Sequence, residues 1–231
     1  MSNEAYFYTI KSFDNKPQCT SDRNQIVLPW ADVKSLSVSN FHKKSISFHP
    51  RTKCQLMYDL ENLYCRFFVQ DHYIKAQILD YQGPVCYDSC VEFFIQPQGL
   101  KGYFNFEINC IGTLHLSHII DPKRDENGFA EAYSVSKNEA SNILILASLG
   151  KTAIIPEIEA PLDWSIEMTV PFVFFQKYIH GFKAPKKKDV WHGNLYKCGD
   201  KTSHPHWASW APIGTDLNFH VPDFFGNFHF D

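Results

Sequence analysis

The 231-residue sequence lacks an excess of charge of either sign. Lysine and arginine together number 22 and aspartate and glutamate 25, which leaves a formal net charge of −3 with neutral histidines. Proteins that bind nucleic acid through its phosphates carry a basic surplus on the binding face. The composition therefore predicts that this chain does not bind nucleic acid.

Long apolar runs are also missing. The longest, Ile143 to Ala147 and Pro171 to Phe175, fall far short of the roughly 20 residues that cross a bilayer. The first ten residues, MSNEAYFYTI, lack the basic and apolar regions of a secretory signal. We therefore expect no membrane partner and a cytoplasmic location for the sequence as it stands. An extracytoplasmic location is expected only if a leader has been lost.

Dense, regularly spaced cysteines are absent as well. The seven cysteines follow irregular spacings, and most lie inside apolar segments, as Cys65 does in LYCRFF. A secreted disulfide scaffold is shorter and richer in cysteine. We expect most of these residues to be reduced thiols that pack as small hydrophobic side chains.

The motifs of several enzyme classes are not found. The sequence has no G-x-S-x-G nucleophile elbow and neither of the glycine-rich phosphate-binding motifs. A cysteine–histidine pairing for nucleophilic catalysis stays open, but no pair stands out.

Aromatic residues and short alternating segments are abundant. There are 20 Phe, 11 Tyr and 5 Trp, enough for a sizeable core. The segment Tyr103 to Cys110 alternates most regularly, with Phe104 and Phe106 on one side and Asn105 and Glu107 on the other. An antiparallel strand with one buried face produces this pattern.

Helical periodicity is scarce, and only Pro171 to Tyr178 is expected to form a short helix. Asp121 to Ser141 is predicted to be a long polar excursion, and Phe224 to Phe230 a closing strand. Many short strands without a composition break predict an all-β fold. We expect one domain, residues 1–231: an antiparallel β-sandwich of jelly-roll type with at most one or two short helices.

Three glutamates lie in the middle of predicted strands with aromatic or apolar neighbours: Glu92, Glu107 and Glu167. Two carboxyl groups across a cleft could be the acid and the nucleophile of a glycosidase. The alternative, which we favour, is that each lies on a polar sheet face or hydrogen-bonds a ligand without catalysis.

Several histidines and cysteines have spacings that could supply zinc ligands. They are His115-x-x-His118, His204-x-His206, and Cys86-x-x-x-Cys90 with Cys198. None repeats a known zinc motif, and hydrogen-bonded histidines in ordered turns are the favoured interpretation. Asp121, Asp125 and Glu126 form an acidic, turn-rich stretch that could bind calcium, but its spacing is not that of an EF-hand.

Aromatic residues gather near the C-terminus, where Trp191, Tyr196, Trp207 and Trp210 lie close to several polar residues. An aromatic ring offers a flat apolar surface to the CH side of a pyranose, and nearby polar groups can hydrogen-bond its hydroxyls. Trp191 shares the parity of Leu195 in a predicted strand and is expected in the core. Trp207 and Trp210 flank a proline-rich turn and are candidate platforms for a sugar.

Five stretches match one known family in order and spacing. They are DSCVEFFI (88–95), YFNFEIN (103–109) followed by Gly112, WSIEMTVP (164–171), the long run 191–213, and PDFFG (222–226). Over roughly residues 23 to 230 the sequence resembles the family 9 carbohydrate-binding modules, in particular their compact stand-alone form.

This resemblance implies a β-sandwich related to the N-terminal-like domain of dopamine β-monooxygenase. It implies non-catalytic binding of glycan fragments or small sugars, of xylan or cellulose origin. Structural calcium occurs in some members, and such modules often accompany xylanases, so a glycoside hydrolase is an expected partner.

The resemblance also carries individual residues. Glu92 matches the glutamate that hydrogen-bonds the sugar, and Trp210 one aromatic wall of the sugar slot, with Trp207 beside it. Lys197 stands where an arginine is frequent, so the charge is kept but the bidentate fork is lost. Asn194 is a further candidate for hydrogen bonds to hydroxyls.

One position departs from the family pattern. Cys86 stands where sugar-binding members usually carry a tryptophan, and the adjacent Tyr87 is the candidate substitute. Loss of this wall favours one alternative to a binding module, an interaction domain that has kept the fold and lost its ligand. A second alternative, a glycoside hydrolase, is based on Glu92 acting with Glu107 or Glu167.

Overall fold

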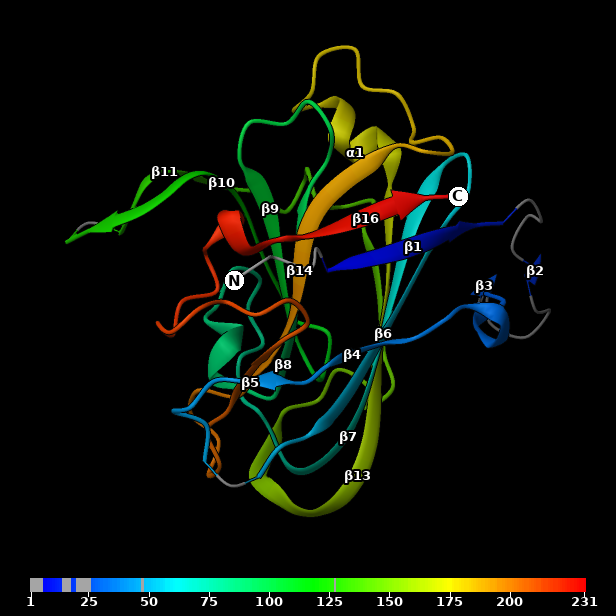
Figure 1. Cartoon of the computed structure of the whole chain (residues 1–231). Helices are drawn as coiled ribbons and strands as arrows, with labels where there is room; N and C mark the ends of the chain where they lie inside the picture. Colours follow the sequence, from blue (N-terminus) through cyan, green and yellow to red (C-terminus); the bar gives the residue numbers. More distant parts are fainter. Residues whose placement is uncertain (1–5, 14–17, 20–25, 47, 127) are drawn as a thin grey trace.

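The computed structural model describes residues 6–13, 18–19, 26–46, 48–126 and 128–231 (Figure 1). Its strands are β1 (Phe7–Ser12), β2 (Gln18–Cys19), β3 (Ile26–Val27), β4 (Leu36–Val38), β5 (Asn40–Phe41), β6 (Arg51–Tyr58), β7 (Asn62–Ala76), β8 (Cys90–Gln96), β9 (Tyr103–Asn109), β10 (Leu114–Asp125), β11 (Gly128–Ser134), β12 (Leu144–Ala147), β13 (Ile154–Pro171), β14 (Val190–Cys198), β15 (Trp207–Ser209) and β16 (Gly226–Phe230). The short helical elements are η1 (Trp30–Asp32), η2 (Val85–Tyr87), α1 (Phe172–Gln176) and η3 (Pro222–Phe224).

The strands form two layers that face each other (Figure 1). One layer has the order β11-β10-β9-β8-β14-β16 and the other β6-β7-β13-β12, and β1 connects them. Phe7 to Ile10 of β1 pair with β16, and Lys11 and Ser12 pair with β6. The predicted all-β sandwich is confirmed. The two ladders of β1 are parallel, whereas the other described ladders are antiparallel.

The core lies between the layers and follows from the period-two pattern of the strands. Val91 and Phe93 of β8 face Phe67 of β7 and Trp164 of β13 across the core, and all four side chains are buried. Trp191 joins this core, as its parity predicts. Burial of such side chains is worth roughly 1.5–3 kcal/mol each and supplies the main stabilisation of the sandwich.

Helix α1 lies inside the segment where the short helix is expected. It begins after Pro171, whose missing amide hydrogen suits a helix start, and it buries Phe174 and Phe175 against the core. Among the described residues, no helix has the length and hydropathy that a membrane span needs.

The segment 121–141 differs from the expected polar excursion. Strand β10 continues to Asp125, and β11 pairs with it to form an arm that extends beyond the sandwich (Figure 1). Arg124 lies 4.2 Å from the ring centroid of Phe129 across this hairpin. The polar composition of this segment predicts a loop, but its backbone forms a strand ladder between β10 and β11. The closing strand at the C-terminus is found as β16.

The β8–β9 hairpin positions two of the candidate glutamates and depends on a glycine. Gly102 has φ of +76°, a conformation that residues with a Cβ rarely adopt. A Cβ at this position would also collide with the backbone of Ile119 and Ile120 in the neighbouring strand β10. Glycine therefore lets β9 enter the sheet between β8 and β10 in the observed register.

Candidate functional site

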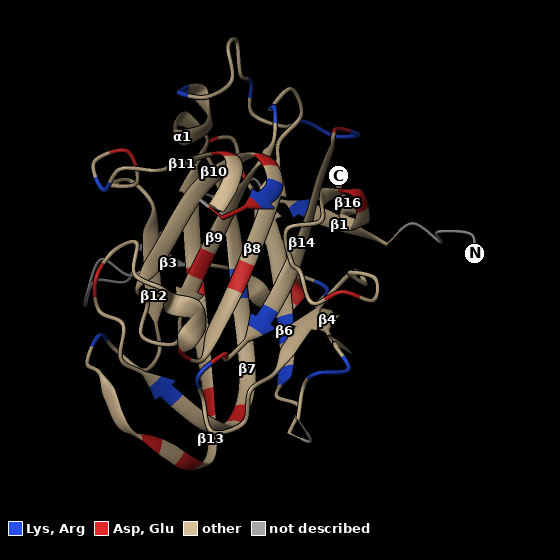
Figure 2. Ribbon diagram, turned by 90° about the vertical axis from the view of Figure 1, so that its left-hand side faces the viewer, with Lys and Arg blue, Asp and Glu red and all other residues tan. Residues whose placement is uncertain are grey.

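Four side chains form a row across the outer face of the sheet made by β14, β8, β9 and β10. Tyr196, Glu92, Glu107 and His115 pair successively in register. The alternation that buries Val91 in the core turns Glu92 to the opposite face. Figure 2 shows the acidic bands of β8 and β9 side by side on this face.

The two carboxyl groups of this row influence each other. Glu92 has an exposed fraction of 4%, and its Oε1 accepts a hydrogen bond of 3.1 Å from the Cys198 thiol. Burial raises the pKa of Glu92 well above its usual value, and the charge of Glu107 raises it further. Burial also raises the pKa of Glu107, although His115 and a hydrogen bond from Asn105 act in the opposite direction. The pair therefore retains protons to a higher pH than free carboxyl groups do.

Asn105 fixes the orientation of Glu107. Its Nδ2 donates to Glu107 Oε1 at 2.8 Å, while its Oδ1 accepts from the backbone amide of Ser117 at 2.9 Å. One oxygen of Glu107, a half-buried residue, is thus held within the sheet face. Asn105 does not contact the second oxygen of Glu107. Of the two glutamates, Glu107 is the more exposed to solvent.

Half-buried aromatic side chains border the row. Phe219, in the segment 211–225, stacks on Tyr196 with 4.1 Å between ring centroids and 14° between the planes. The Tyr196 hydroxyl donates to the Phe219 carbonyl oxygen at 2.9 Å and holds this segment on the sheet. Phe219 also packs in one apolar cluster with Trp207 and Cys86. A flat apolar ring is therefore available next to the acidic row.

Tyr87 lies in η2, next to this border. Its ring is half-buried, and the ammonium of Lys201 lies 3.5 Å from the ring centroid. Trp207 is also half-buried and donates its indole N–H to Asp200 at 2.7 Å. Cys86 places no aromatic ring at its position, so Tyr87 and Trp207 are the aromatic groups on this side.

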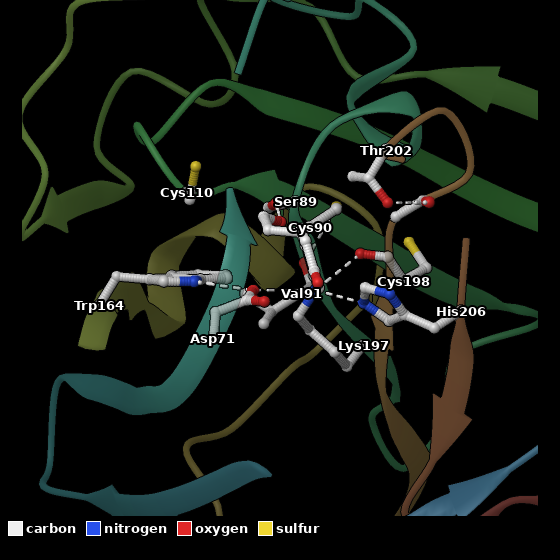
Figure 3. A network of polar contacts seen from close by, with 12 residues as sticks. Asp71, Ser89, Cys90, Val91, Cys110, Trp164, Lys197, Cys198, Thr202 and His206 are labelled. Carbon is white, nitrogen blue, oxygen red and sulfur yellow. Dashed lines mark hydrogen bonds and ion pairs between the residues drawn. The ribbon is translucent and has the colours of Figure 1, made fainter. Parts of the chain in front are cut away.

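Lys197 lies on the other face of the sheet, which separates it from Glu92. Its side chain is fully buried in the sandwich, where Nζ lies 3.7 Å from Asp71 of the opposite layer (Figure 3). Nζ also lies 2.7 Å from Nε2 of His206 and donates to the Cys198 carbonyl oxygen at 2.9 Å. The predicted role of Lys197 beside Glu92 in a sugar site therefore does not fit its position.

Asn194 is on the same face as Glu92, but its amide is occupied. Its Nδ2 donates to the Ala211 carbonyl oxygen, and its Oδ1 accepts from the Ala211 amide, both at 2.9 Å. It is also fully buried. Asn194 holds the segment after β15 against the sheet and has no free group for a sugar hydroxyl.

Trp210 is a core residue and not an open platform. Its exposed fraction is 6%, and it stacks on Phe228 with 5.1 Å between ring centroids and 15° between the planes. An edge of the ring contributes to a groove of about 410 Å³, with Tyr6, Tyr8 and Asn40 among its lining residues. The proline-rich turn beside Trp210 suggested exposure, but the ring packs between the layers.

Glu167 is distant from the other two glutamates. It lies on β13, in the opposite layer, with Ile166 and Met168 pointing into the core on either side. Its carboxylate lies 3.4 Å from Nε of Arg66 and accepts a hydrogen bond from the indole of Trp30. A catalytic pair of Glu92 with Glu167 is therefore excluded by the two-layer architecture, whereas Glu92 and Glu107 are neighbours.

The predicted calcium ligands lie at the outer end of β10: Asp121 and Asp125 are on the strand, and Glu126 follows it. Among the described residues, the group of three or more potential ligands whose ligand atoms converge is Cys90, Glu92 and Cys198. Asp121, Asp125 and Glu126 are not part of that group.

The predicted histidine sites have structural roles. His118 packs against Phe104, and its Nε2 lies 2.8 Å from the Lys101 carbonyl oxygen. His204 stacks on Tyr73, and its carbonyl oxygen lies 2.8 Å from Nδ1 of His206. Both histidine pairs are hydrogen-bonded, as expected, although His118 lies in strand β10 and not in a turn.

The cysteines with described side chains form no disulfide bonds with one another. Of the cysteines with described side chains, all are free: Cys54, Cys65, Cys86, Cys90, Cys110 and Cys198. Cys86 is half-buried, and the other five are buried. Cys19 falls outside the described side chains.

Two residues near the site were not identified from the sequence. Asp88 is fully buried, and its carboxylate accepts from the backbone amides of Gln77 and Ile78 and from the side chain of Asn109. Asp88 therefore anchors the start of β8. Phe219 was missed because single aromatic residues in a turn-rich tail carry no periodic signal, and only the folded chain brings it next to Tyr196.

Comparison with known proteins was made by sequence and by fold. The sequence model of Carbohydrate-binding family 9 matches residues 22–230. The search of curated proteins gives no match. Among solved structures, a protein from Bacteroides uniformis ATCC 8492 to which carbohydrate binding is attributed is 24% identical, with a TM-score of 0.80 and coverage of 99% of this chain and 100% of that chain.

Two further structures are of family 9 modules from Caldicellulosiruptor kristjanssonii. The one in complex with glucose is 12% identical, with a TM-score of 0.58 and coverage of 98% of this chain and 96% of that chain. The one in complex with cellotriose is 12% identical, with a TM-score of 0.59 and coverage of 98% and 94%. At this level of identity, both structures show a shared fold.

Proposed function

Because the chain belongs to carbohydrate-binding family 9, we propose that a sugar binds on the outer sheet face at Glu92 and Glu107. Membership of this family supports the function predicted from the sequence, which is carbohydrate binding without catalysis. The observation that supports this location is the pair of adjacent carboxyl groups beside a half-buried aromatic ring, Phe219.

The chemistry of the face suits a pyranose. Sugar hydroxyls donate hydrogen bonds, and the half-buried carboxyl group of Glu107 offers an acceptor oriented by Asn105. The ring of Phe219 is held flat by its stack on Tyr196, so the CH side of a sugar can lie against it. A few polar groups beside an apolar surface are the usual composition of a small-ligand site.

The proposed ligands are short β-linked glucose or xylose oligosaccharides and their monosaccharides. The Caldicellulosiruptor kristjanssonii modules were solved with glucose and with cellotriose. With Cys86 in place of an aromatic wall, stacking comes from one side. An aromatic contact is worth about 0.5–1.5 kcal/mol, so we expect weak binding of short ligands. A glycoside hydrolase partner stays a prediction from the resemblance.

The arrangement of the carboxyl groups argues against a glycosidase. Glu92 and Glu107 are direct cross-strand neighbours on one sheet face. The two carboxyl groups of a glycosidase flank the scissile bond from opposite sides. A sugar lying on this face would meet both groups from the same side, which suits hydrogen bonding and not bond cleavage.

The test is calorimetric titration of the full chain with glucose, cellotriose and xylotriose. We expect Glu107→Gln to weaken binding about tenfold or more, because the substitution replaces one of the two carboxyl oxygens with an amide nitrogen that cannot accept a hydrogen bond from a sugar hydroxyl. The matched control is Glu167→Gln, which changes the same residue type on the opposite layer and leaves sugar affinity unchanged. Equal affinity in wild type, Glu107→Gln and Glu92→Gln, all folded, would place the site elsewhere.

Wild type, Glu92→Gln and Glu107→Gln also test whether the protein is a glycosidase. Incubation of wild type with aryl glycosides of glucose and xylose is expected to give no turnover. Hydrolysis by wild type that is lost in Glu92→Gln or Glu107→Gln would contradict the non-catalytic proposal.

A further inference from the structure

Two cysteines come together with Glu92 on the same sheet face, next to the acidic row. Cys90 of β8 and Cys198 of β14 are direct cross-strand partners, and Glu92 follows two residues later on the same face as Cys90. The ligand atoms of the three residues all lie within 4.8 Å of one another, and all three side chains are buried. The Cys198 Sγ and Glu92 Oε1 atoms are 3.1 Å apart.

The surroundings of this group are acidic. Cys86 and Asp200 are half-buried. Burial raises the pKa of the Cys86 thiol, and the charges of Glu107, Glu92 and Asp200 raise it further. Burial likewise raises the pKa of Cys90 to about 11. Lys197 lies on the other face and is engaged with Asp71 and His206. Burial therefore favours the protonated form of the thiol groups and of Glu92.

We propose that Cys90, Glu92 and Cys198 bind a thiophilic divalent cation such as Zn²⁺ or Cd²⁺. Two thiolates and one carboxylate are a ligand set that suits zinc and other borderline or soft metals and is poorly suited to calcium or magnesium. Zn–S bonds of about 2.3 Å place tetrahedral ligand atoms roughly 3.8 Å apart, so the observed separations need only small side-chain movements.

Charge and access are compatible with this cation. Binding releases the two thiol protons and, where Glu92 is protonated, its proton to solvent, and the divalent cation takes their place. A water molecule would complete the tetrahedron as fourth ligand. The side of the site next to Cys86 is half-buried, and the Cys86 carbonyl oxygen is 3.9 Å from Cys198 Sγ. The site lies in the same layer as the proposed sugar site and shares Glu92 with it, but it requires no sugar.

The test titrates Cd²⁺ alone, without sugar, into the reduced full chain and records ultraviolet thiolate-to-cadmium charge transfer. We expect a saturable signal at one equivalent in wild type, competed by Zn²⁺ and lost in Cys198→Ser. The control is Cys54→Ser, because Cys54 and Cys65 are another thiol pair, with 3.6 Å between the sulfur atoms, in the other layer. This control keeps the signal.

Glu92→Gln provides a second variant that keeps both thiols. We expect it to weaken Cd²⁺ binding about tenfold or more while the charge-transfer band remains. Absence of a saturable band in wild type would overturn the proposal, as would loss of the band in Cys54→Ser with retention in Cys198→Ser. Cys198→Ser retains Glu92 and Glu107, the two residues of the proposed sugar site. Sugar titration of this variant therefore tests the sugar proposal independently of metal binding.

Discussion

Lys197 shows how a charged residue can be part of a sandwich core. It has the parity of Leu195 and Trp191, both of which are buried between the layers. Its ammonium is compensated by Asp71 and His206. Burial and the nearby charge of Lys197 hold the pKa of His206 well below its usual value, so the imidazole is neutral and can accept from the ammonium.

We expect Lys197→Met to lower the free energy of unfolding by about 3–5 kcal/mol, because it leaves the Asp71 carboxylate buried without its partner. Urea unfolding measures the change. Lys201→Met is the control, since that exposed ammonium lies over Tyr87 and its loss should cost less than about 1 kcal/mol. Equal stability of Lys197→Met and wild type would show that the network does not compensate a buried charge.

Trp210 is expected to matter for stability and not for sugar contact. Truncation of a buried tryptophan that stacks on Phe228 should cost about 3–5 kcal/mol. Urea unfolding of Trp210→Ala and sugar titration of its folded fraction measure both effects. If Trp210→Ala has wild-type stability but no longer binds sugar, Trp210 is a binding platform after all.

At the scale of elements, the segment 211–225 decides what the acidic face can do. It is held on the sheet by the Tyr196 hydroxyl and by a 2.8 Å hydrogen bond between Tyr103 and Nδ1 of His220. These contacts hold Phe219 on the ring of Tyr196, the cross-strand partner of Glu92. Because this segment has little regular structure, its position depends on a few named contacts.

His220 makes this attachment sensitive to pH. Burial and the charge of Arg124 lower its pKa from 6.5 to about 3. The unfolded chain therefore binds a proton that the folded chain excludes, and stability falls as pH drops from about 6.5 toward 3, by up to about 1.4 kcal/mol per pH unit. Above about pH 6.5 this contribution is constant.

The measurement is urea unfolding of wild type and His220→Gln between pH 7 and pH 4.5. At pH 7 we expect the variant to be the less stable protein, because it loses the contact with Tyr103. The gap should narrow as pH falls, since the variant cannot take up this proton. Parallel stability profiles over the whole range would contradict a neutral His220 in the folded protein.

At the scale of the molecule, the two layers separate two kinds of polar group. The pair of Glu92 and Glu107 lies on the outer face of one layer, whereas the network of Asp71, Lys197 and His206 connects the layers from within. Substitutions in the network should therefore change stability, and substitutions in the pair should change ligand binding.

Alternation along the chain was sufficient to predict the sandwich, its closing strand β16 and the buried position of Trp191. It was also sufficient to place Glu92 and Glu107 on polar faces, because side-chain direction in a strand is set by parity. The family was predicted from five short stretches, and the match over residues 22–230 confirms it.

The sequence by itself determined the all-β class, the family and the core direction of residues such as Trp191. It did not reveal the pairing of β10 with β11 or the burial of Lys197 and Trp210. The tertiary structure decided which strands are neighbours. It brought Cys198 to Cys90, Asp71 to Lys197 and Phe219 to Tyr196, contacts between residues far apart in the chain. Parity gives a side chain its direction, but the partner that it meets depends on strand order and layer packing, which no local pattern encodes.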